Sequence, residues 1–413
     1  MVTGRHIYMA NKKNPYTPGA GRPPAYLAGR ETELEEIQSI LDDLVDCDCV
    51  RSEIFYGLRG VGKTVLLNTI EEMCNNREEI VCKFFEAAEF SDFKSKITTA
   101  LYQILLSLNN QERIKDKLRK AKGLLRAFHC KWNPSEQEFD FSFGENIDEY
   151  SGRGIVDTGN FSTDLLELTI AVGEAAKESS CSICLLIDEM QYLKKDELEA
   201  LIGALHRCNQ KNIPICVFGA GLPKIAKDAG DAKSYAERLF AFKEIGSLSN
   251  DEAAAALIEP AKDVGVSYSS DAVQCIVYLT GGYPYFIQEY GRQIWKHSPI
   301  QKNDTITLDL AKSVEQYFWK ELDESFFKVR FDRATPKEQR FMFSMAQCNR
   351  TPCTVADVAK VMGEETSSIS PVRAQLIHKG LIYATRHGEI DYTVPGFSKY
   401  LRRFHPQYFN DAI

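Results

Sequence analysis

Short apolar runs alternate with amphipathic stretches over residues 30–245. Strands are predicted for the apolar runs at residues 54–56, 80–85, 183–187, 213–218 and 242–245. Between them, apolar residues recur at the 3.6-residue spacing of a helix, beginning with the stripe that follows Arg30. Apolar strands that alternate with helices predict an α/β fold, in which a parallel sheet is covered on both faces.

Three later segments depart from this rhythm. Residues 110–165 hold a lysine-rich helix followed by Phe139, Phe141 and Phe143 alternating with polar residues, which predicts an inserted, partly exposed hairpin or loop. From Ser249 to about residue 327 the pattern is entirely helical. After Arg333 it predicts three short helices and a two-stranded tail.

Composition excludes several classes of protein. No apolar run reaches the length of a membrane-spanning helix, and residues 1–28, which predict an extended arm, lack the apolar core of a signal peptide. We therefore expect a cytoplasmic protein with no membrane partner. Its 12 cysteines do not predict a disulfide framework.

The cysteines are expected in the core or on the surface. Cys82, Cys184 and Cys216 stand in apolar strands, where a cysteine acts as a small hydrophobe. The pairs Cys47/Cys49 and Cys181/Cys184 resemble halves of a zinc site, but neither has a second pair at ligand spacing.

Charge is distributed unevenly. Residues 333–413 contain 11 lysine and arginine residues against 7 aspartate and glutamate residues, a net charge of +4, whereas the rest of the chain carries −12. This small basic excess is compatible with a nucleic-acid partner.

The segment GLRGVGKT, residues 57–64, matches the phosphate-binding pattern G-x-x-x-x-G-K-[ST]. Its glycines let backbone N–H groups converge on phosphate oxygens at the start of a helix. Lys63 then contacts the β- and γ-phosphates of ATP, and the Thr64 hydroxyl binds Mg²⁺. The predicted nucleotide contacts are Gly57, Leu58, Arg59, Gly60, Val61, Gly62, Lys63, Thr64 and Val65.

The segment CSICLLIDEM, residues 181–190, predicts a buried strand that ends in two carboxylates. Ligands of open α/β sheets bind at this carboxyl edge. Asp188 is therefore predicted to hold Mg²⁺ through water, and Glu189 to orient and deprotonate the attacking water. The alternative is that both residues only cap the following helix.

With these motifs, the upstream GRETEL and the helical and C-terminal segments, the chain resembles the AAA+ ATPases. It is most similar to the group that holds the origin-recognition/Cdc6-like initiators and the prokaryotic and archaeal ATPases related to STAND signalling proteins. The resemblance implies a nucleotide domain at residues 29–247, a helical lid at 248–330 and a winged helix-turn-helix at 331–413.

The resemblance also implies further nucleotide contacts. Gly29 and Arg30 would lie near the adenine, unless they only begin a helix. Pro284 of GGYPYFIQ matches the Gly-x-Pro of STAND ATPases, where proline touches the base, or it is only the first residue of a helix. Arg292 is a weak substitute for the sensor-2 arginine that this segment lacks. Arg238 would reach the γ-phosphate of a neighbouring subunit, or form a surface ion pair.

One strand departs from the family pattern. The strand at residues 213–218 occupies the sensor-1 position but ends in Phe-Gly-Ala-Gly, without a polar side chain, which puts the hydrolysis rate in doubt. Gln191 is an alternative contact to the water, although we expect its side chain to face solvent.

The winged helix implied for the C-terminal segment places its third helix in the DNA major groove and its wing on phosphates. Candidate contacts are Ser367, Ser368, Ser370, Arg373, Gln375, His378, Lys379 and Arg386.

We therefore expect an ATPase, slow or stimulated by a partner, that couples ATP and Mg²⁺ to double-stranded DNA in replication, transposition or mobile-element defence. The alternative is a STAND-like signalling switch whose winged helix binds protein. A homo-oligomer or an ATP-dependent protein partner is expected in either case.

Overall fold

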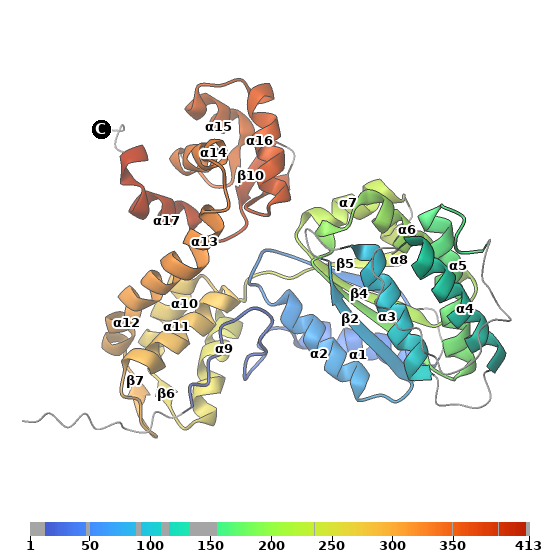
Figure 1. Ribbon diagram of the computed structural model, residues 1–413. Coiled ribbons are helices and arrows are strands. Elements are labelled where there is room, and N and C mark those ends of the chain that lie inside the picture. Colours follow the sequence, from blue (N-terminus) through green and yellow to red (C-terminus); the bar gives the residue numbers. More distant parts are fainter. Residues whose placement is uncertain are drawn as a thin grey trace, which may run out of the picture. The chain divides into compact units, whose positions relative to one another are not determined.

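The computed structural model describes residues 13–46, 50–87, 92–108, 115–132, 155–234, 236–348, 350–386 and 388–409. They form two compact units (Figure 1). One contains residues 30–57 and 62–245, and the other contains residues 1–29, 58–61 and 246–413. Within the described segments, each helix is too short or too polar to cross a bilayer.

The first unit is built on a five-stranded sheet in the order β2-β3-β4-β1-β5. Every neighbouring pair is parallel, which confirms the predicted α/β class. The strands are β1 (Ser52–Tyr56), β2 (Ile80–Glu86), β3 (Ser182–Asp188), β4 (Ile215–Gly221) and β5 (Phe240–Glu244).

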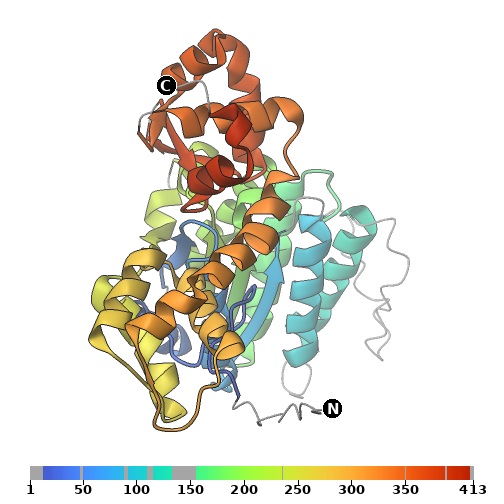
Figure 2. The same ribbon diagram turned by 90° about the vertical axis from the view of Figure 1, so that its left-hand side faces the viewer.

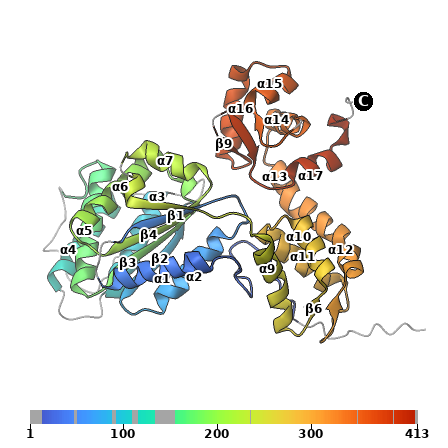
Figure 3. The ribbon, with the colours of Figure 1, turned by 180° about the vertical axis from the view of Figure 1, so that it is seen from behind.

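Helices cover both faces of this sheet (Figures 1 and 3). The helices α1 (Glu31–Val45) and α2 (Lys63–Asn75) pack on one face. The opposite face is covered by α3 (Phe93–Ser107), α4 (Lys115–Trp132), α5 (Phe161–Glu178) and α6 (Lys195–Gln210), followed by α7 (Lys224–Ala232) and α8 (Ala236–Leu239). Alternate side chains of β3 point to opposite faces of the sheet, and those of Ile183, Leu185 and Ile187 are buried in the core between the sheet and α3–α6.

The predicted insertion is part of this core as far as it is described. Leu118, Leu124, Leu125 and Phe128 of the predicted lysine-rich helix, α4, are buried, whereas the exposed hairpin or loop expected after this helix stays a prediction. The apolar stripe of the helix packs into the core despite the high lysine content of the helix, and Lys122 is itself buried, with 1% of its surface exposed. Phe139, Phe141 and Phe143 lie outside the described residues.

The second unit begins with a helical layer. Its elements are α9 (Asn250–Asp263), β6 (Ser267–Tyr268), α10 (Ser270–Thr280), α11 (Pro284–His297), β7 (Thr305–Ile306), α12 (Leu308–Glu321), a π-helical turn (Leu322–Phe327) and α13 (Lys328–Phe331). The described part of the N-terminal arm is anchored on this layer. The buried Tyr16 hydroxyl donates to the Leu257 carbonyl oxygen at 2.5 Å, and its ring packs edge-on against Trp295.

The C-terminal segment, residues 334–409, combines helices with a small antiparallel sheet. It contains α14 (Pro336–Gln347), β8 (Cys353–Thr354), α15 (Val355–Met362), α16 (Thr366–His378), β9 (Ile382–Arg386), β10 (Glu389–Tyr392) and α17 (Phe397–Phe404). The sheet order is β8-β10-β9. Beyond the predicted three helices and two strands, the structure adds β8 and α17, and the assignment as a winged helix stays a prediction.

A shared aromatic core joins the helical layer to the C-terminal segment. Figure 2 shows α12 and α13 leading as one helical rod into that segment. Phe327 in the π-helical turn lies 6.4 Å from Phe286 of α11, 5.6 Å from Phe397 and 5.3 Å from Tyr400, measured between ring centroids. Because these rings pack together without solvent, the two parts of this unit are held as one body.

Candidate nucleotide site

The glycine loop begins where β1 ends and closes onto α2. The Gly57 N–H donates to the Gly221 carbonyl oxygen of β4 at 3.2 Å, which fixes the start of the loop on the sheet. Gly60 and Gly62 have φ angles of +84° and +100°, a region that side chains with a Cβ rarely adopt. α2 then starts at Lys63, so its first N–H groups, with their partial positive charge, lie at the loop.

Lys63 and Thr64 extend from the first turn of α2. The Lys63 ammonium donates to the Gly57 carbonyl oxygen at 2.9 Å. The tip residues 58–61 group with the second unit, where the Tyr285 N–H donates to the Gly60 carbonyl oxygen at 3.3 Å. Val65 is half-buried.

Thr64 and Asp188 meet at the carboxyl end of β3. The Thr64 hydroxyl donates to Asp188 Oδ2 at 2.6 Å, although 124 positions separate the two residues in the chain. Asp188 is 5% exposed, and this burial raises the pKa of its carboxyl group, against the lowering effect of the Thr64 hydrogen bond. A hydroxyl and a carboxylate oxygen side by side are the hard donors that Mg²⁺ prefers, so the donor set fits this ion.

Glu189 follows in a left-handed conformation, with φ of +54°. Its N–H donates to Asp188 Oδ1 at 2.7 Å. A residue other than glycine held in this region stores strain, which often occurs at functional sites. Glu189 is the residue before the 3₁₀ helix Met190–Tyr192, so the chain turns away from the direction of β3 at this position.

Gln191 is buried, so the expectation that it faces solvent was wrong. Its side-chain amide donates to Glu189 Oε2, and its Oε1 accepts from the Leu222 N–H at 2.9 Å. Gln191 therefore ties the Glu189 carboxylate to the end of β4. These contacts of Gln191 could not be predicted from the sequence, because they depend on the left-handed turn at Glu189.

The glycines at the end of β4 explain this arrangement. A Cβ on Gly219 would lie 2.1 Å from Met190 Sδ, and a Cβ on Gly221 would lie 3.1 Å from Gln191 Oε1. Larger residues there would displace the 3₁₀ helix. The side-chain amide of Gln191, from the loop after the neighbouring strand β3, thus lies beside the end of β4, where the sequence offers no polar side chain.

The other predicted nucleotide contacts differ in their surroundings. Gly29 adopts φ of +62°, and Arg30 is buried where α1 begins. Pro284 is the first residue of α11, as the simpler alternative predicts, which leaves its contact with a base as a prediction. Arg292 bonds to Glu289 at 2.9 Å and Glu321 at 3.3 Å, so its acidic partners oppose the proposed sensor role.

Arg238 lies in α8, directly before β5, and is exposed. Its predicted role toward another subunit stays a prediction. The described residues include no ion pair between Arg238 and Glu237.

Several of the predicted DNA contacts form bonds within the protein itself. The Lys379 ammonium donates to Glu338 Oε2 at 2.7 Å and to the Arg333 carbonyl oxygen at 3.1 Å, and its contact with DNA stays a prediction. Arg386 is 76% exposed but bonds to Glu389 at 2.6 Å. The Ser368 hydroxyl donates to the Glu365 carbonyl oxygen at 2.8 Å.

Arg373 is half-buried, and its Nε has no hydrogen-bond partner among the described residues. Ser367, Ser370, Gln375 and His378 lie on the same helix, α16.

Comparison with known proteins identifies two matching families. Residues 26–218 match the AAA ATPase domain, and residues 324–401 match Domain of unknown function (DUF8462). No curated protein matches the chain.

Solved structures share the fold over most of the chain. The Walker-type ATPase PABY2304 of Pyrococcus abyssi is 13% identical, with a TM-score of 0.55, and the match covers 92% of this chain and 98% of that one. The Aeropyrum pernix ORC2 protein, solved as ADPNP–ADP complexes, is 12% identical, with a TM-score of 0.51, and the match covers 92% and 95%.

Proposed function

We propose, from the premise that residues 26–218 belong to the AAA ATPase family, that the protein binds ATP with Mg²⁺ and hydrolyses it. The observation that carries the proposal is the pair of Thr64 and Asp188 oxygens 2.6 Å apart beside the glycine loop. The bound nucleotides named for the Aeropyrum ORC2 protein, which shares the fold, are consistent with it.

Each residue of the site has one task. Lys63 exchanges its bond to the Gly57 carbonyl for the β- and γ-phosphates of ATP. Thr64 and Asp188 would hold Mg²⁺, whose chemistry is to neutralise charge on the phosphate oxygens. Glu189 orients water and accepts its proton, while Gln191 holds the Glu189 carboxylate in place.

Nucleotide binding is tested with Lys63→Ala. Binding of a fluorescent ATP analogue with Mg²⁺ should be lost, while the circular dichroism spectrum stays unchanged. Lys211→Ala, which removes an exposed lysine just after α6, is the matched control and should bind as the wild type does. Equal affinity in both variants would contradict the assignment of the loop.

For the output of the ATPase, we favour a protein partner at the C-terminal segment. Several of its basic side chains are paired with acids of the same unit, in Lys379–Glu338, Arg386–Glu389, Arg340–Glu364 and Arg403–Asp323. Such pairs neutralise the positive charge with which lysine and arginine side chains would bind the phosphates of DNA. Val361, Phe404 and Tyr408 are 40%, 53% and 50% exposed, and exposed apolar side chains suit a protein surface.

Double-stranded DNA is the second candidate, favoured by the exposure of Arg386 and the net charge of +4 over residues 333–413. An exposed ion pair contributes little stability and exchanges readily for a phosphate. If Arg386 contacts a phosphate, Arg386→Glu should lower the slope of log affinity against log salt by about 0.9.

The control is Lys262→Glu, the same charge change on the exposed side of α9. If the wild type binds duplex DNA in neither the ATP nor the ADP state, the protein-partner proposal is supported. Tight binding that only Arg386→Glu weakens would favour DNA.

A further inference from the structure

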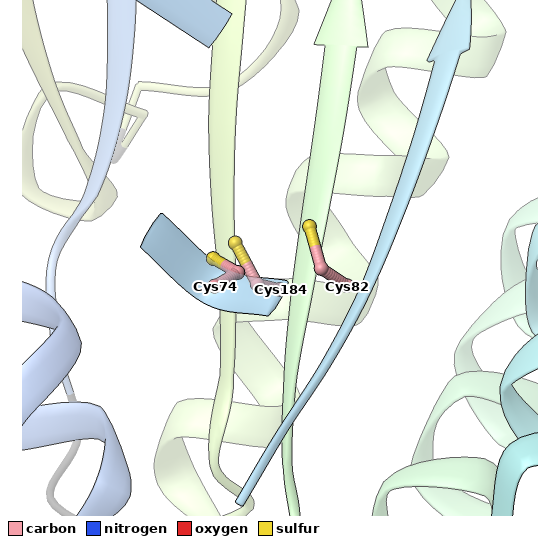
Figure 4. A group of neighbouring side chains, drawn as sticks. All are labelled: Cys74, Cys82 and Cys184. Carbon is pink, nitrogen blue, oxygen red and sulfur yellow. The ribbon is translucent and has the colours of Figure 1, made fainter. Parts of the chain in front are cut away.

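Three cysteine thiols converge in the first unit, far along the chain from one another. Cys74, Cys82 and Cys184 are buried, and their sulfur atoms all lie within 4.8 Å of one another. Figure 4 shows the three side chains reaching one spot from a helix and two neighbouring strands. The sequence pairs Cys47/Cys49 and Cys181/Cys184 do not form this group: Cys47 and Cys49 lie outside the described residues, and Cys181 is not among its members.

The parallel register of the sheet produces the cluster. Cys82 of β2 is paired directly with Cys184 of β3. Paired residues of neighbouring parallel strands point to the same face, here the face on which α2 packs. Cys74, in the last turn of α2, lies next to these two cysteines.

We propose that Cys74, Cys82 and Cys184 form a binding site for one thiophilic metal ion of the Zn²⁺ type. A zinc–sulfur bond is about 2.3 Å long, so three sulfurs around one ion in a plane lie about 4.0 Å apart. The observed limit of 4.8 Å is within a small side-chain adjustment of that value. Thiolates are soft ligands that select such ions, whereas Mg²⁺ prefers oxygen.

The surroundings favour a cation at this position. The carbonyl groups in the last turn of α2 carry partial negative charge, which attracts a positive ion. A divalent ion with three thiolates has a net charge of −1, and Arg77 is near enough to Cys74 to interact electrostatically with it. Binding displaces the thiol protons, so it releases up to three protons for each ion.

The ion would act structurally, by holding the end of α2 against β2 and β3. The same helix begins with Lys63 and Thr64, and β3 ends with Asp188. The cluster lies toward the other end of both elements, so a bound ion would fix the end of α2 against the sheet. Cys82, which is 8% exposed, offers the route for entry.

The test uses the full-length protein, reduced, stripped with a chelator and titrated with Cd²⁺, which gives a thiolate-to-metal charge-transfer absorption. One equivalent should bind, with release of protons. Cys184→Ala and Cys74→Ala should each weaken binding by more than about tenfold, since even the loss of a residue that only supports a metal ligand costs about 10–100-fold. Cys208→Ala, at a buried cysteine on the opposite face, is the matched control.

A second measurement does not depend on how the variants fold. Zn²⁺ should slow alkylation of Cys82 in the wild type, followed by mass spectrometry, whereas Mg²⁺ should not. The proposal is overturned if the wild type binds no stoichiometric Cd²⁺, if Cys184→Ala and Cys208→Ala bind equally well, or if the purified protein holds a disulfide within the cluster.

Discussion

Replacing Gln191 with methionine tests how the carboxylate of Glu189, the proposed general base, is held. Methionine has nearly the same length and volume as glutamine but neither donates nor accepts strongly, so packing against Gly221 is retained. The variant loses the bond to Glu189 Oε2 and the bond from the Leu222 N–H.

Two magnitudes follow from these contacts. A hydrogen bond to an ionised carboxylate contributes about 1.5–3 kcal/mol. If it serves mainly to orient Glu189 in the transition state, kcat should fall roughly 10- to 150-fold, at about 1.4 kcal/mol for each factor of ten. Leaving the buried Leu222 N–H without an acceptor should lower the free energy of unfolding by about 1–3 kcal/mol.

The assay combines steady-state phosphate release, ATP binding and urea unfolding. ATP affinity should stay close to that of the wild type, because Gln191 contacts the carboxylate and not the glycine loop. Gln210→Met, at an exposed glutamine at the end of α6, is the matched control and should change neither kcat nor stability. A loss of stability with unchanged kcat would refute the role of Gln191 in positioning Glu189.

Three further predictions concern other residues. Glu189→Gln should retain ATP binding and lower turnover by about 10²–10⁴, because an amide cannot accept the proton of water; undiminished turnover would exclude Glu189 as the base. Arg238→Ala should lower turnover without weakening ATP binding, and wild-type activity should rise more than linearly with protein concentration. A linear rise together with a fully active variant would exclude a contact of Arg238 with the γ-phosphate of a neighbouring subunit. Burial raises the pKa of Glu53 to about 7, from 4.5, so the folded protein holds this proton more tightly than the unfolded chain. The free energy of unfolding should therefore fall by up to about 3 kcal/mol as pH rises through that interval, and Glu53→Gln should remove this dependence in urea titrations.

The sequence by itself predicted the fold class and the nucleotide motifs. Gly57–Thr64 is one continuous segment, so its strand, turn and helix are specified by neighbouring residues, and the left-handed Gly60 and Gly62 occupy the positions where such a loop needs them. Asp188 was also predictable, because a strand of a parallel sheet ends at the edge where ligands bind.

Only the tertiary structure decided what the side chains of these and other residues contact. Lys379 pairs with Glu338, 41 positions away, and a basic residue whose partner is distant looks available in the sequence. Gln191 turns inward because Glu189 takes a left-handed conformation and Gly221 leaves space beside it.

The cysteines show the same limit most clearly. Ligand spacing along the chain drew attention to Cys181 and Cys184, whereas the thiols that meet are Cys74, Cys82 and Cys184. Hydrophobic periodicity specifies which face of a strand is buried, but not which residue of the next strand lies beside it. That pairing is set by the register of β2 on β3 and by the packing of α2, which arise when the whole sheet assembles.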